Sequence, residues 1–521
     1  MKKKGFTLVE LLAIIVILGI IMSIATPIII KIINDSKKET YKLSMSGYVR
    51  AVEEQIAVNK AKGKITKNGN YNIKNFEVGY SGQLADKGNF SVNDELVSSA
   101  QLCFDTYLVK YDGKEVTLTE KGCKKEATVN LVIGEKTYKN TVKDDIETEF
   151  NISDNISNIT NIVCNNGVTI SMNDNTLKLS DVFNDANCTM SSSINTTFDN
   201  LDDTKNYILM LKDENISETL IIKENKNITI DLNGKDINPG QVLGFDNSGV
   251  FRLKGIDEKE DANISIYGAH QIINNNSTGV LYIDNVNIKS TGSVAVKNKG
   301  IFNFNNSVIF QEHLSTAISN DENGIINIEN SNINSSKHEC ISNNSSSNVT
   351  INGGELISHN ANCISNNSSG NIIIVDNLGP VYVASFNDAN KPGYWYKGII
   401  NKAIGNIYIS GRNSDVCSNE ANKTGICIYT EIGRSVLNEG SATGNIYING
   451  ATIKSGYLAV NNYDGKIYIC NSEVDGITYD VSNENGYVYY NDKKVFKNDR
   501  LHDKNDPSHI VLKSDLICEA K

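Results

Sequence analysis

Residues 295–366 read AVKNKGIFNFNNSVIFQEHLSTAISNDENGIINIENSNINSSKHECISNNSSSNVTINGGELISHNANCISN, and a short phrase recurs within them. Two apolar residues separated by one residue are followed two positions later by Asn or Gly, as in IFNFNN at 301–306, IINIEN at 325–330 and NVTING at 348–353. A repeat at a near-constant period indicates stacked structural units and outweighs the local preference of any one segment. This stretch therefore decides the predicted fold class.

The phrase continues on both sides, from about residue 227 to about residue 470. The second apolar residue of each copy is Ile266, Ile283, Phe304, Ile328, Ile351, Ile374, Ile409, Ile448 or Ile469. Five of the eight gaps span 21–24 residues, which suits one turn of a parallel β-helix. The pattern resembles right-handed β-helices of the pectate-lyase type. The predicted fold class is mostly β, with a right-handed parallel β-helix at 201–490 and a C-terminal cap and tail at 491–521.

A second column supports this fold independently. Asparagine stands two positions after an apolar residue at Asn298, Asn320, Asn343, Asn366, Asn401 and Asn462. Stacked amides can form a hydrogen-bonded ladder, and Asn tolerates the left-handed backbone of a tight turn. The residue before the apolar one is mostly small, and two successive turns have Cys340 and Cys363 there. Adjacent strands lie about 4.8 Å apart, within disulfide range, so a bridge is predicted in preference to two buried thiols.

Two longer gaps, of 35 and 39 residues, predict insertions in consecutive turns that should protrude together. The first contains Tyr394, Trp395 and Tyr396, and the second contains Cys417 and Cys427, which could close a small loop. Long loops on a rigid scaffold often carry function, and exposed aromatic rings can stack on sugars or anchor a protein partner. The three aromatic residues are binding candidates; the alternative is that they pack against the coil.

Enzymes that cleave polysaccharides also use this fold, so the fold alone does not decide the function. Lyases need clustered calcium-binding acids with a basic residue, and hydrolases need close carboxylates. Neither motif set is evident, and the four histidines of the repeat region fit solvated turns. The sequence therefore predicts no catalytic residues, no metal and no cofactor, with a membrane-tethered polysaccharide lyase or hydrolase as an alternative.

The region before the repeat predicts two smaller β units. Residues 63–123 alternate in short runs and include Asp112-Gly113, a hairpin signal, with Cys103 and Cys123 placed to bridge its open end. Residues 124–200 suggest a small β-sandwich-like spacer, in which Cys164 and Cys188 flank two candidate strands. At the other end of the chain, Cys518 could return to Cys470 as part of a cap.

The amino terminus opens MKKKGFTLVE, and residues 11–30 are almost wholly apolar. About twenty such residues cross the hydrocarbon core of a bilayer as a helix, and the lysines should stay on the cytoplasmic side. The apolar run grades into an amphipathic segment in which Tyr48, Val52, Ile56 and Ala57 recur at helical spacing. One helix is predicted over 6–62, with its membrane-spanning part at about 9–33.

The same residues resemble the prepilin signature of type IV pilins and type II secretion pseudopilins, a Gly followed by FTLxELL after a Lys-rich leader. The resemblance implies that prepilin peptidase removes leader residues 1–5 by cutting after Gly5, and that the new terminus, Phe6, is N-methylated. It also implies that Glu10 pairs with the terminal amine of a neighbouring subunit during assembly, which would neutralise two charges in an apolar bundle.

Together these features predict a minor type IV pilin-like protein. It would start in the cytoplasmic membrane with its head outside and then reach the cell surface or a pilus, with prepilin peptidase, other pilin subunits and the assembly machinery as partners. The head would act in adhesion or in glycan or host-surface recognition; the alternative is a pseudopilin for secretion or DNA uptake. The net charge of −11 argues against a nucleic-acid partner, and the ten cysteines fit an exported, disulfide-permissive setting.

Overall fold

The computed structural model describes residues 36–60 and, with short gaps, 69–501; the longest gaps are 152–157, 257–265, 388–395 and 412–424. The chain divides into two compact units. The first contains the residues up to Ser153 together with Asn166–Cys188, and the second contains Asp154–Asn165 and the residues from Thr189 onward. The structure is mostly β, as predicted from the repeat.

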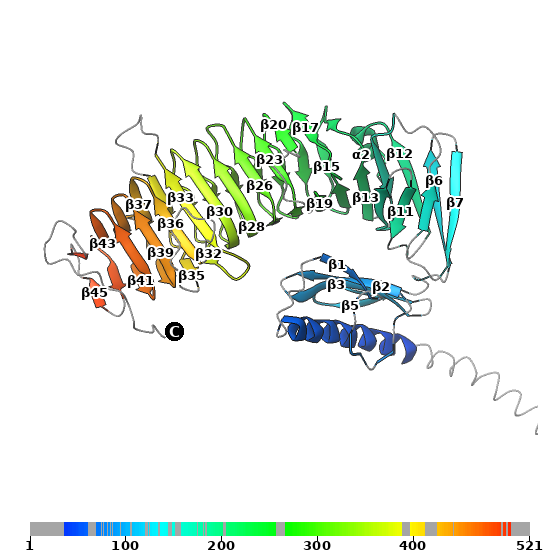
Figure 1. Ribbon diagram of the computed structural model, residues 1–521, viewed down its shortest axis with the longest axis horizontal. Helices are drawn as coiled ribbons and strands as arrows, with labels where there is room; N and C mark the ends of the chain where they lie inside the picture. Colours follow the sequence, from blue (N-terminus) through cyan, green and yellow to red (C-terminus); the bar gives the residue numbers. More distant parts are fainter. Residues whose placement is uncertain are drawn as a thin grey trace, which may run out of the picture. The chain divides into compact units, whose positions relative to one another are not determined.

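In the first unit, the helix at 36–60 packs on a five-stranded antiparallel sheet (Figure 1). The sheet runs in the order β1 (Gly69–Asn72), β2 (Lys87–Asn93), β3 (Leu96–Phe104), β4 (Tyr107–Tyr111) and β5 (Val116–Thr119). The helix buries Met45, Tyr48, Val52 and Ile56 at three- and four-residue spacing, which is the amphipathic pattern of the sequence. Ala57 is exposed, so its predicted place on the buried face was wrong.

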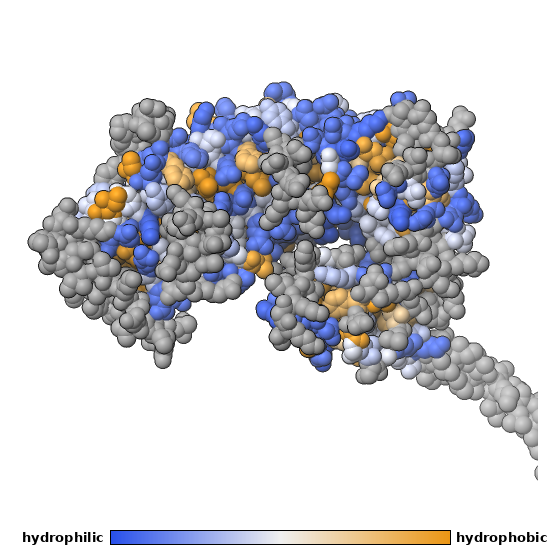
Figure 2. All heavy atoms as spheres, in the orientation of Figure 1, coloured by the Kyte–Doolittle hydropathy of each residue, from blue (hydrophilic) through white to orange (hydrophobic). Residues whose placement is uncertain are grey.

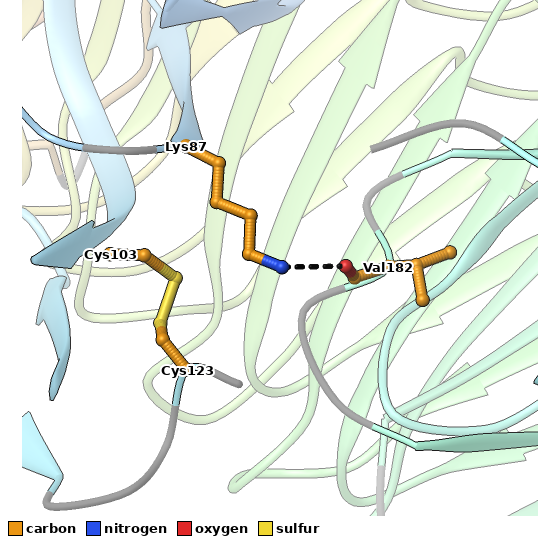
Figure 3. The surroundings of a disulfide bond; sticks show 4 residues. All are labelled: Lys87, Cys103, Cys123 and Val182. Atoms are coloured by element: carbon orange, nitrogen blue, oxygen red, sulfur yellow. Dashed lines mark hydrogen bonds between the residues drawn. A yellow bond between two sulfur atoms is a disulfide. The ribbon is translucent and has the colours of Figure 1, made fainter. Parts of the chain in front are cut away.

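The predicted hairpin and disulfide of this region are both present. Strands β4 and β5 pair across the turn at Asp112, whose carboxylate accepts hydrogen bonds from the backbone N–H groups of Lys114 and Glu115 at 2.9 and 2.8 Å. These bonds lower the pKa of Asp112. Cys103 and Cys123 form a disulfide that joins β3 to the segment after β5, with a Cα–Cα distance of 5.7 Å (Figure 3).

The remaining strands before the repeat form a hairpin and a small sheet. The hairpin is β6 (Glu126–Ile133) with β7 (Lys136–Lys143), and the antiparallel sheet runs β10 (Thr169–Asn173), β11 (Thr176–Ser180) and β8 (Thr148–Asn151). Buried Lys87 of β2 donates a 3.5 Å hydrogen bond to the carbonyl of Val182, just after β11 (Figure 3). This contact connects the helix-bearing sheet to the later part of the first unit.

The second unit contains a parallel β-solenoid of about eleven turns in residues 205–489, whose strands stack in order along the chain (Figure 1). Each turn contributes one strand to each of three sheets, named here by their order within a turn.

Sheet 1 contains β15 (Leu220–Ile222), β18 (Phe245–Asn247), β21 (Ile273–Asn275), β24 (Val296–Asn298), β27 (Ile318–Asn320), β29 (Ile341–Asn343), β31 (Ile364–Asn366), β34 (Tyr396–Asn401), β37 (Gly433–Asn438), β40 (Leu458–Asn462) and β43 (Tyr479–Asn483). Sheet 2 contains β13 (Lys205–Met210), β16 (Asn227–Asp231), β19 (Val250–Lys254), β22 (Val280–Asp284), β25 (Ile301–Asn305), the first halves of β28 (Ile325–Ser335) and β30 (Val349–His359), β32 (Ile372–Val375), β35 (Ile407–Ser410), β38 (Asn445–Asn449), β41 (Lys466–Cys470) and β44 (Tyr487–Tyr490). Sheet 3 contains β14 (Glu214–Asn215), β17 (Ile237–Gly240), β20 (Ile266–Gly268), β23 (Asn287–Ser290), β26 (Val308–Gln311), the second halves of β28 and β30, β33 (Val381–Phe386), β36 (Ile426–Thr430), β39 (Ala451–Ser455) and β42 (Glu473–Gly476).

The second apolar residues of the repeat, called here the marker column, stack on one another in sheet 2 from Ile283 to Ile469, as predicted. The start of the marker column needs one correction. Ile266 lies in sheet 3, where it pairs with Ile237 and Ile288. The true neighbour of Ile283 in sheet 2 is Leu253. The turn between these two residues contains the extra segment 257–265, so the shorter spacing from Ile266 was misleading.

The predicted asparagine ladder is present and is longer than predicted. Each amide Nδ2 donates to the Oδ1 of the next ladder residue at 2.7–3.1 Å. The ladder also includes Asn247, Asn275, Asn438 and Asn483. The left-handed turns belong to a different column, between sheets 2 and 3, where Asn285, Asn306, Asn330 and Asn471 have φ of 45–58°. The two roles predicted for one column are therefore divided between two.

The core of the solenoid is formed by the inward residues of all three sheets, most of them Ile, Val, Leu and Phe with no exposed surface. Cys340 and Cys363 lie in this core as free thiols, with their sulfur atoms 3.0 Å apart. The predicted bridge between them was therefore wrong. Strand stacking brings the two sulfur atoms into contact, but contact alone does not supply the oxidation that a disulfide needs.

Both ends of the solenoid carry non-repeating elements. At the first end, β9 (Asn161–Cys164) pairs antiparallel with β13, and the helix α2 (Ile194–Asp199) places Ile194 in the core; β12 (Ala186–Ser191) precedes α2. At the last end, β45 (Lys493–Val495) and β46 (Asp499–Leu501) pair antiparallel with β44 and β43. Among the described residues, no helix is long and apolar enough to cross a membrane, and the predicted span at 9–33 lies outside them.

Candidate functional site

The two predicted insertions are attached to neighbouring turns of the solenoid. Segment 388–395 follows β33 and precedes β34, whereas segment 412–424 follows β35 and precedes β36. Because β33 and β36 are paired neighbours in sheet 3, the insertions adjoin opposite ends of the same strand pair. The outer face of sheet 3 therefore lies between their attachment points. The insertions themselves lie outside the described residues, so their protruding together stays a prediction.

That outer face carries an aromatic cluster, defined here as His359, Tyr382, Phe386 and Tyr429. The ring of Phe386 stacks on His359 at a centroid distance of 5.4 Å and contacts Tyr429 at 5.6 Å. Burial raises the pKa of Tyr382 to about 12, with further contributions from Tyr429 and Glu355. His359 is exposed and the other three are half-buried, so solvent reaches parts of all four rings. The cluster offers apolar ring surface between the attachment points of the two insertions.

A cationic pair, Lys397 and Arg434, lies just around the corner on sheet 1. The two residues are direct neighbours on the paired strands β34 and β37. The Arg434 guanidinium lies 5.7 Å from the ring centre of Tyr463 and donates to its hydroxyl at 3.3 Å. Burial, and next the charge of Arg434, lower the pKa of Lys397. The lowered pKa thus reflects mainly the partial burial of the ammonium and secondly the nearby charge of Arg434.

The aromatic cluster and the cationic pair meet at one corner of the solenoid. The hydroxyls of Thr430, at the end of β36, and Ser435, near the start of β37, lie 3.1 Å apart beneath it. Four residues separate them, and Tyr429 directly precedes Thr430 whereas Arg434 directly precedes Ser435. Ring surface and positive charge are therefore presented on two faces that join at Thr430 and Ser435.

A polar group lies at the same corner in earlier turns. His338 Nδ1 is 2.9 Å from the Glu339 carboxylate, which also accepts hydrogen bonds from Thr316 at 3.2 Å and Ser365 at 3.0 Å. Burial acts to raise the pKa of Glu339, but the hydrogen bonds from His338 and Ser365 outweigh it, and the pKa lies below its usual value. His338 therefore contacts a carboxylate, contrary to its interpretation as a solvated turn residue.

The predicted site residues have the following outcomes. Tyr396 begins β34, is half-buried and directly precedes Lys397, whereas Tyr394 and Trp395 lie outside the described residues, as do Gly5, Phe6 and Glu10. Cys164, Cys188, Cys427 and Cys470 each take part in a disulfide, and Cys417 and Cys518 lie outside the described residues. Within the described part of the chain, no three His, Cys, Asp or Glu side chains are grouped to hold a metal ion.

The residues that form the corner were missed because they belong to no motif. Phe386 and Tyr429 are single aromatic residues on strands, and Lys397 and Arg434 are 37 positions apart. The signal that could have paired them was the asparagine column: Asn438 follows Asn401 in the ladder, which puts Arg434 next to Lys397. Figure 2 shows a mixed exterior, with apolar residues exposed among hydrophilic ones on the solenoid face in view.

Comparison with known proteins identifies a sequence motif at the amino terminus, which lies outside the described residues. Residues 1–26 match the family described as the prokaryotic N-terminal methylation motif. The first residues thus carry a methylation motif of the kind found in pilin-like proteins, and a small antiparallel sheet and a parallel β-solenoid follow later in the chain. No curated protein and no solved structure matches the chain.

Proposed function

We propose that this protein is a minor type IV pilin-like subunit whose solenoid recognises glycans on a surface. The methylation motif implies processing by prepilin peptidase, a membrane-anchored amino terminus and pilus-type assembly. The aromatic cluster supports the recognition role, because exposed ring surface on a rigid scaffold suits contact with sugar rings. This cluster is the observation on which the proposal rests.

A low-abundance or tip position follows from the size of the head. A solenoid of about eleven turns, added to a small pilin-like sheet, would crowd a shaft in which every subunit carried one. Pilin-like subunits assemble through the amino-terminal helix, so the head must fit between its neighbours at the spacing of those helices. A subunit with this head is best accommodated where neighbours are few.

Recognition without catalysis is also part of the proposal. The carboxylate at the corner, Glu339, accepts hydrogen bonds from three side chains and has a lowered pKa, which suits a fixed anion better than a proton donor. A screen of polysaccharides for newly formed unsaturated or reducing ends tests this part. Release of products that stops on Glu339→Gln would establish an enzyme instead.

Immunogold microscopy of native cells tests the assembly role. Gold at filament tips, or at rare points along filaments, is the expected result. Labelling confined to the membrane would favour a pseudopilin of a secretion or DNA-uptake system, and dense labelling along whole filaments would contradict the minor-subunit role.

Binding of the full-length protein to immobilised oligosaccharides tests the recognition role. Phe386→Ala removes the ring at the centre of the aromatic cluster and should weaken binding about tenfold or more, as loss of an aromatic contact does. The matched control is Tyr267→Ala, which removes an exposed ring from β20, also in sheet 3. Equal binding by both variants and the unmodified protein would contradict the assignment of the cluster.

A further inference from the structure

The outer face of sheet 2 carries a row of stacked tyrosines in the last turns of the solenoid. This tyrosine row consists of Tyr408, Tyr447, Tyr468 and Tyr489 on β35, β38, β41 and β44, which pair in register. The residue before each of them lies in the core, so the four side chains point outward. Neighbouring ring centres are 5.0–5.1 Å apart, and the ring planes lie within 3–6° of parallel. The hydroxyl groups therefore repeat at nearly the same distance along the solenoid.

The tyrosine row is accessible to a ligand. Tyr408 is 37% exposed, and the other three tyrosines are half-buried. Among the described residues, none accepts a hydrogen bond from any of the four hydroxyls. Each phenol hydroxyl can donate one hydrogen bond and can also accept. The ring faces contact one another within the row, so what the row presents to a ligand is a line of ring edges and hydroxyl groups.

The positions beside the tyrosine row are mostly polar and carry little charge. Asn445, Lys466 and Tyr487 form the outward column on one side, and Ser410, Asn449 and Cys470 form the column on the other. Of these six residues only Lys466 is charged, and Ser410 and Asn449 are exposed. A face of regularly spaced hydroxyl and amide groups suits a neutral ligand that is itself rich in hydroxyl groups, rather than an ion or an apolar partner.

The spacing of the tyrosine row discriminates between linear polymers. An extended peptide repeats its same-face side chains at about 6.6–6.8 Å, so it falls out of step with rings 5.0–5.1 Å apart. A nucleic acid is disfavoured by the net charge of −11. An extended β-(1→4)-linked glycan advances by close to the ring spacing with each sugar, so consecutive sugars meet consecutive tyrosines. An α-(1→4)-linked glucan coils and loses this match.

We propose that the tyrosine row binds a neutral, extended β-(1→4)-linked glycan that lies along the solenoid axis with one sugar per turn. The phenol hydroxyls exchange hydrogen bonds with the sugar hydroxyls, and the matched spacing lets the four contacts form together. This inference rests on the glycan recognition proposed above, to which it adds a second surface and a linkage class. The two surfaces occupy the same part of the solenoid, because Tyr408 of β35 and Tyr429 of β36 lie in one turn.

The test measures how binding to the full-length protein depends on glycan length and linkage, by titration calorimetry. The probes are β-(1→4)-linked dimers, tetramers and hexamers of glucose and of N-acetylglucosamine, with the α-(1→4)-linked glucose tetramer as the linkage control. Affinity should rise at least about tenfold from dimer to tetramer, as two more tyrosines form hydrogen bonds, and should change little from tetramer to hexamer. The α-linked tetramer should bind at least about tenfold more weakly than the β-linked one. The better series identifies the sugar.

Two variants connect this binding to the tyrosine row. Tyr447→Phe and Tyr468→Phe each remove one hydroxyl from the middle of the row and keep the ring stack. Each should weaken binding of the preferred tetramer about two- to tenfold, as loss of a neutral hydrogen bond does. The matched control is Tyr282→Phe in β22, which lies on the same face of sheet 2 outside the row and should bind as the unmodified protein does. Circular dichroism and melting temperature confirm that each variant folds.

The outcomes separate this inference from the proposed function. If no sugar probe binds, glycan recognition and this inference both fail, and self-association that the two tyrosine variants abolish would then assign the row to a second copy of the chain. If sugars bind and Phe386→Ala weakens them, but the tyrosine variants change nothing, only the inference fails. Equal binding of the α- and β-linked tetramers, or no gain from dimer to tetramer, would also overturn it. Weaker binding by the tyrosine variants with Phe386→Ala unchanged would support the row and remove the role of the aromatic cluster.

Discussion

Asparagine performs two separate tasks in the solenoid, and the side chain explains both. In the ladder column the amide donates to one neighbour and accepts from the other, so a chain of buried amides runs through successive turns. In the turn column between sheets 2 and 3, Asn306 and Asn330 adopt the left-handed backbone, which Asn tolerates better than most residues. The excess of asparagine in the sequence follows from these two requirements.

The ladder should be sensitive to interruption. Asn343→Ala removes one fully buried amide, leaving Asn320 and Asn366 without their 2.8 Å partners. We expect a loss of roughly 2–4 kcal/mol from unpaired polar groups and the cavity, measured by thermal or denaturant unfolding of the full chain. The control is Asn344→Ala at the next, exposed position, which should cost less than about 1 kcal/mol. Equal losses would show that the ladder contributes no more than surface amides do.

The contact between His338 and Glu339 predicts a pH-dependent contribution to stability. Its hydrogen bond to Glu339 raises the pKa of His338 above the ordinary value of 6.5. The stabilisation is therefore fully present below pH 6.5 and is lost as pH rises through the raised pKa. His338 is 45% exposed, so solvent screening keeps the effect below about 1 kcal/mol.

The measurement compares the free energy of unfolding of His338→Gln with that of the unmodified chain between pH 5 and pH 9. The difference should be largest at pH 5 and should vanish at the alkaline end. His270→Gln serves as the control at another histidine of the solenoid. A difference that stays constant across this range, or grows with pH, would contradict the assigned pair.

At the scale of elements, a row of tyrosines stabilises the last turns of sheet 2. Tyr408, Tyr447, Tyr468 and Tyr489 stack in register, with ring centres 5.0–5.1 Å apart and ring planes within 3–6° of parallel. Three of them belong to the repeats NIYISG, NIYING and KIYICN, and each lies between the two apolar residues of its repeat. The sequence thus contained the signal, but it becomes a ladder only once the register is known.

Tyr447 lies inside this row and contacts a ring on each side. Tyr447→Ala should cost about 1–3 kcal/mol, since each aromatic pair contributes about 0.5–1.5 kcal/mol beyond its buried area. Tyr447→Phe retains both ring contacts and should cost less than about 1 kcal/mol. Unfolding of the two variants under the same conditions checks this. Similar losses for both would assign the effect to the hydroxyl rather than to stacking.

The neighbouring thiols that directly precede β29 and β31 give a chemical test of the sheet 1 register. Cys340 and Cys363 have no exposed surface, and burial raises the pKa of Cys340 well above its usual value. Both should therefore resist alkylation in the native protein and react fully after unfolding without a reductant. Mass spectrometry of the two cysteine peptides measures this, with Cys103 and Cys123, joined by a disulfide, as the unreactive control. Recovery of a cross-linked Cys340–Cys363 peptide would contradict the free thiols.

The periodic elements were predictable and the irregular ones were not. Spacing of 21–24 residues, a column of Asn and alternating apolar residues are local signals, and each survives in the register of the three sheets. The start of the marker column was missed because segment 257–265 lengthens its turn. The candidate site was missed for a related reason: its residues come from sheets 1 and 3 across two insertions, and only exact strand pairing brings them together.

At the scale of the whole molecule, the methylation motif and the solenoid are separate parts of one chain. The first 26 residues match a motif for processing and pilus-type assembly, whereas the solenoid core is closed on itself by its own apolar residues. Assembly and display can therefore be altered independently.

Glu10→Ala tests the assembly half alone. The prepilin resemblance implies that this carboxylate pairs with the terminal amine of a neighbouring subunit. Without it, the protein should stay in the membrane and filaments should carry no label. Cleavage after Gly5 should continue. Fractionation and mass spectrometry of the amino terminus measure the two effects. Glu39→Ala, which removes an exposed acid that pairs with Lys42, is the matched control and should assemble. Normal assembly of Glu10→Ala would remove the role assigned to this residue.

Because successive turns of the solenoid are similar, its length can change by one whole turn at a time. Asn298 and Asn320 occupy equivalent positions 22 residues apart, so excising residues 299–320 would join two compatible strands and leave every column in register. The corner at Arg434 would then lie one strand spacing, about 4.8 Å, closer to the start of the solenoid with its chemistry unchanged. Gain or loss of single turns is thus a route by which related proteins could vary their reach while keeping the same surface at this corner.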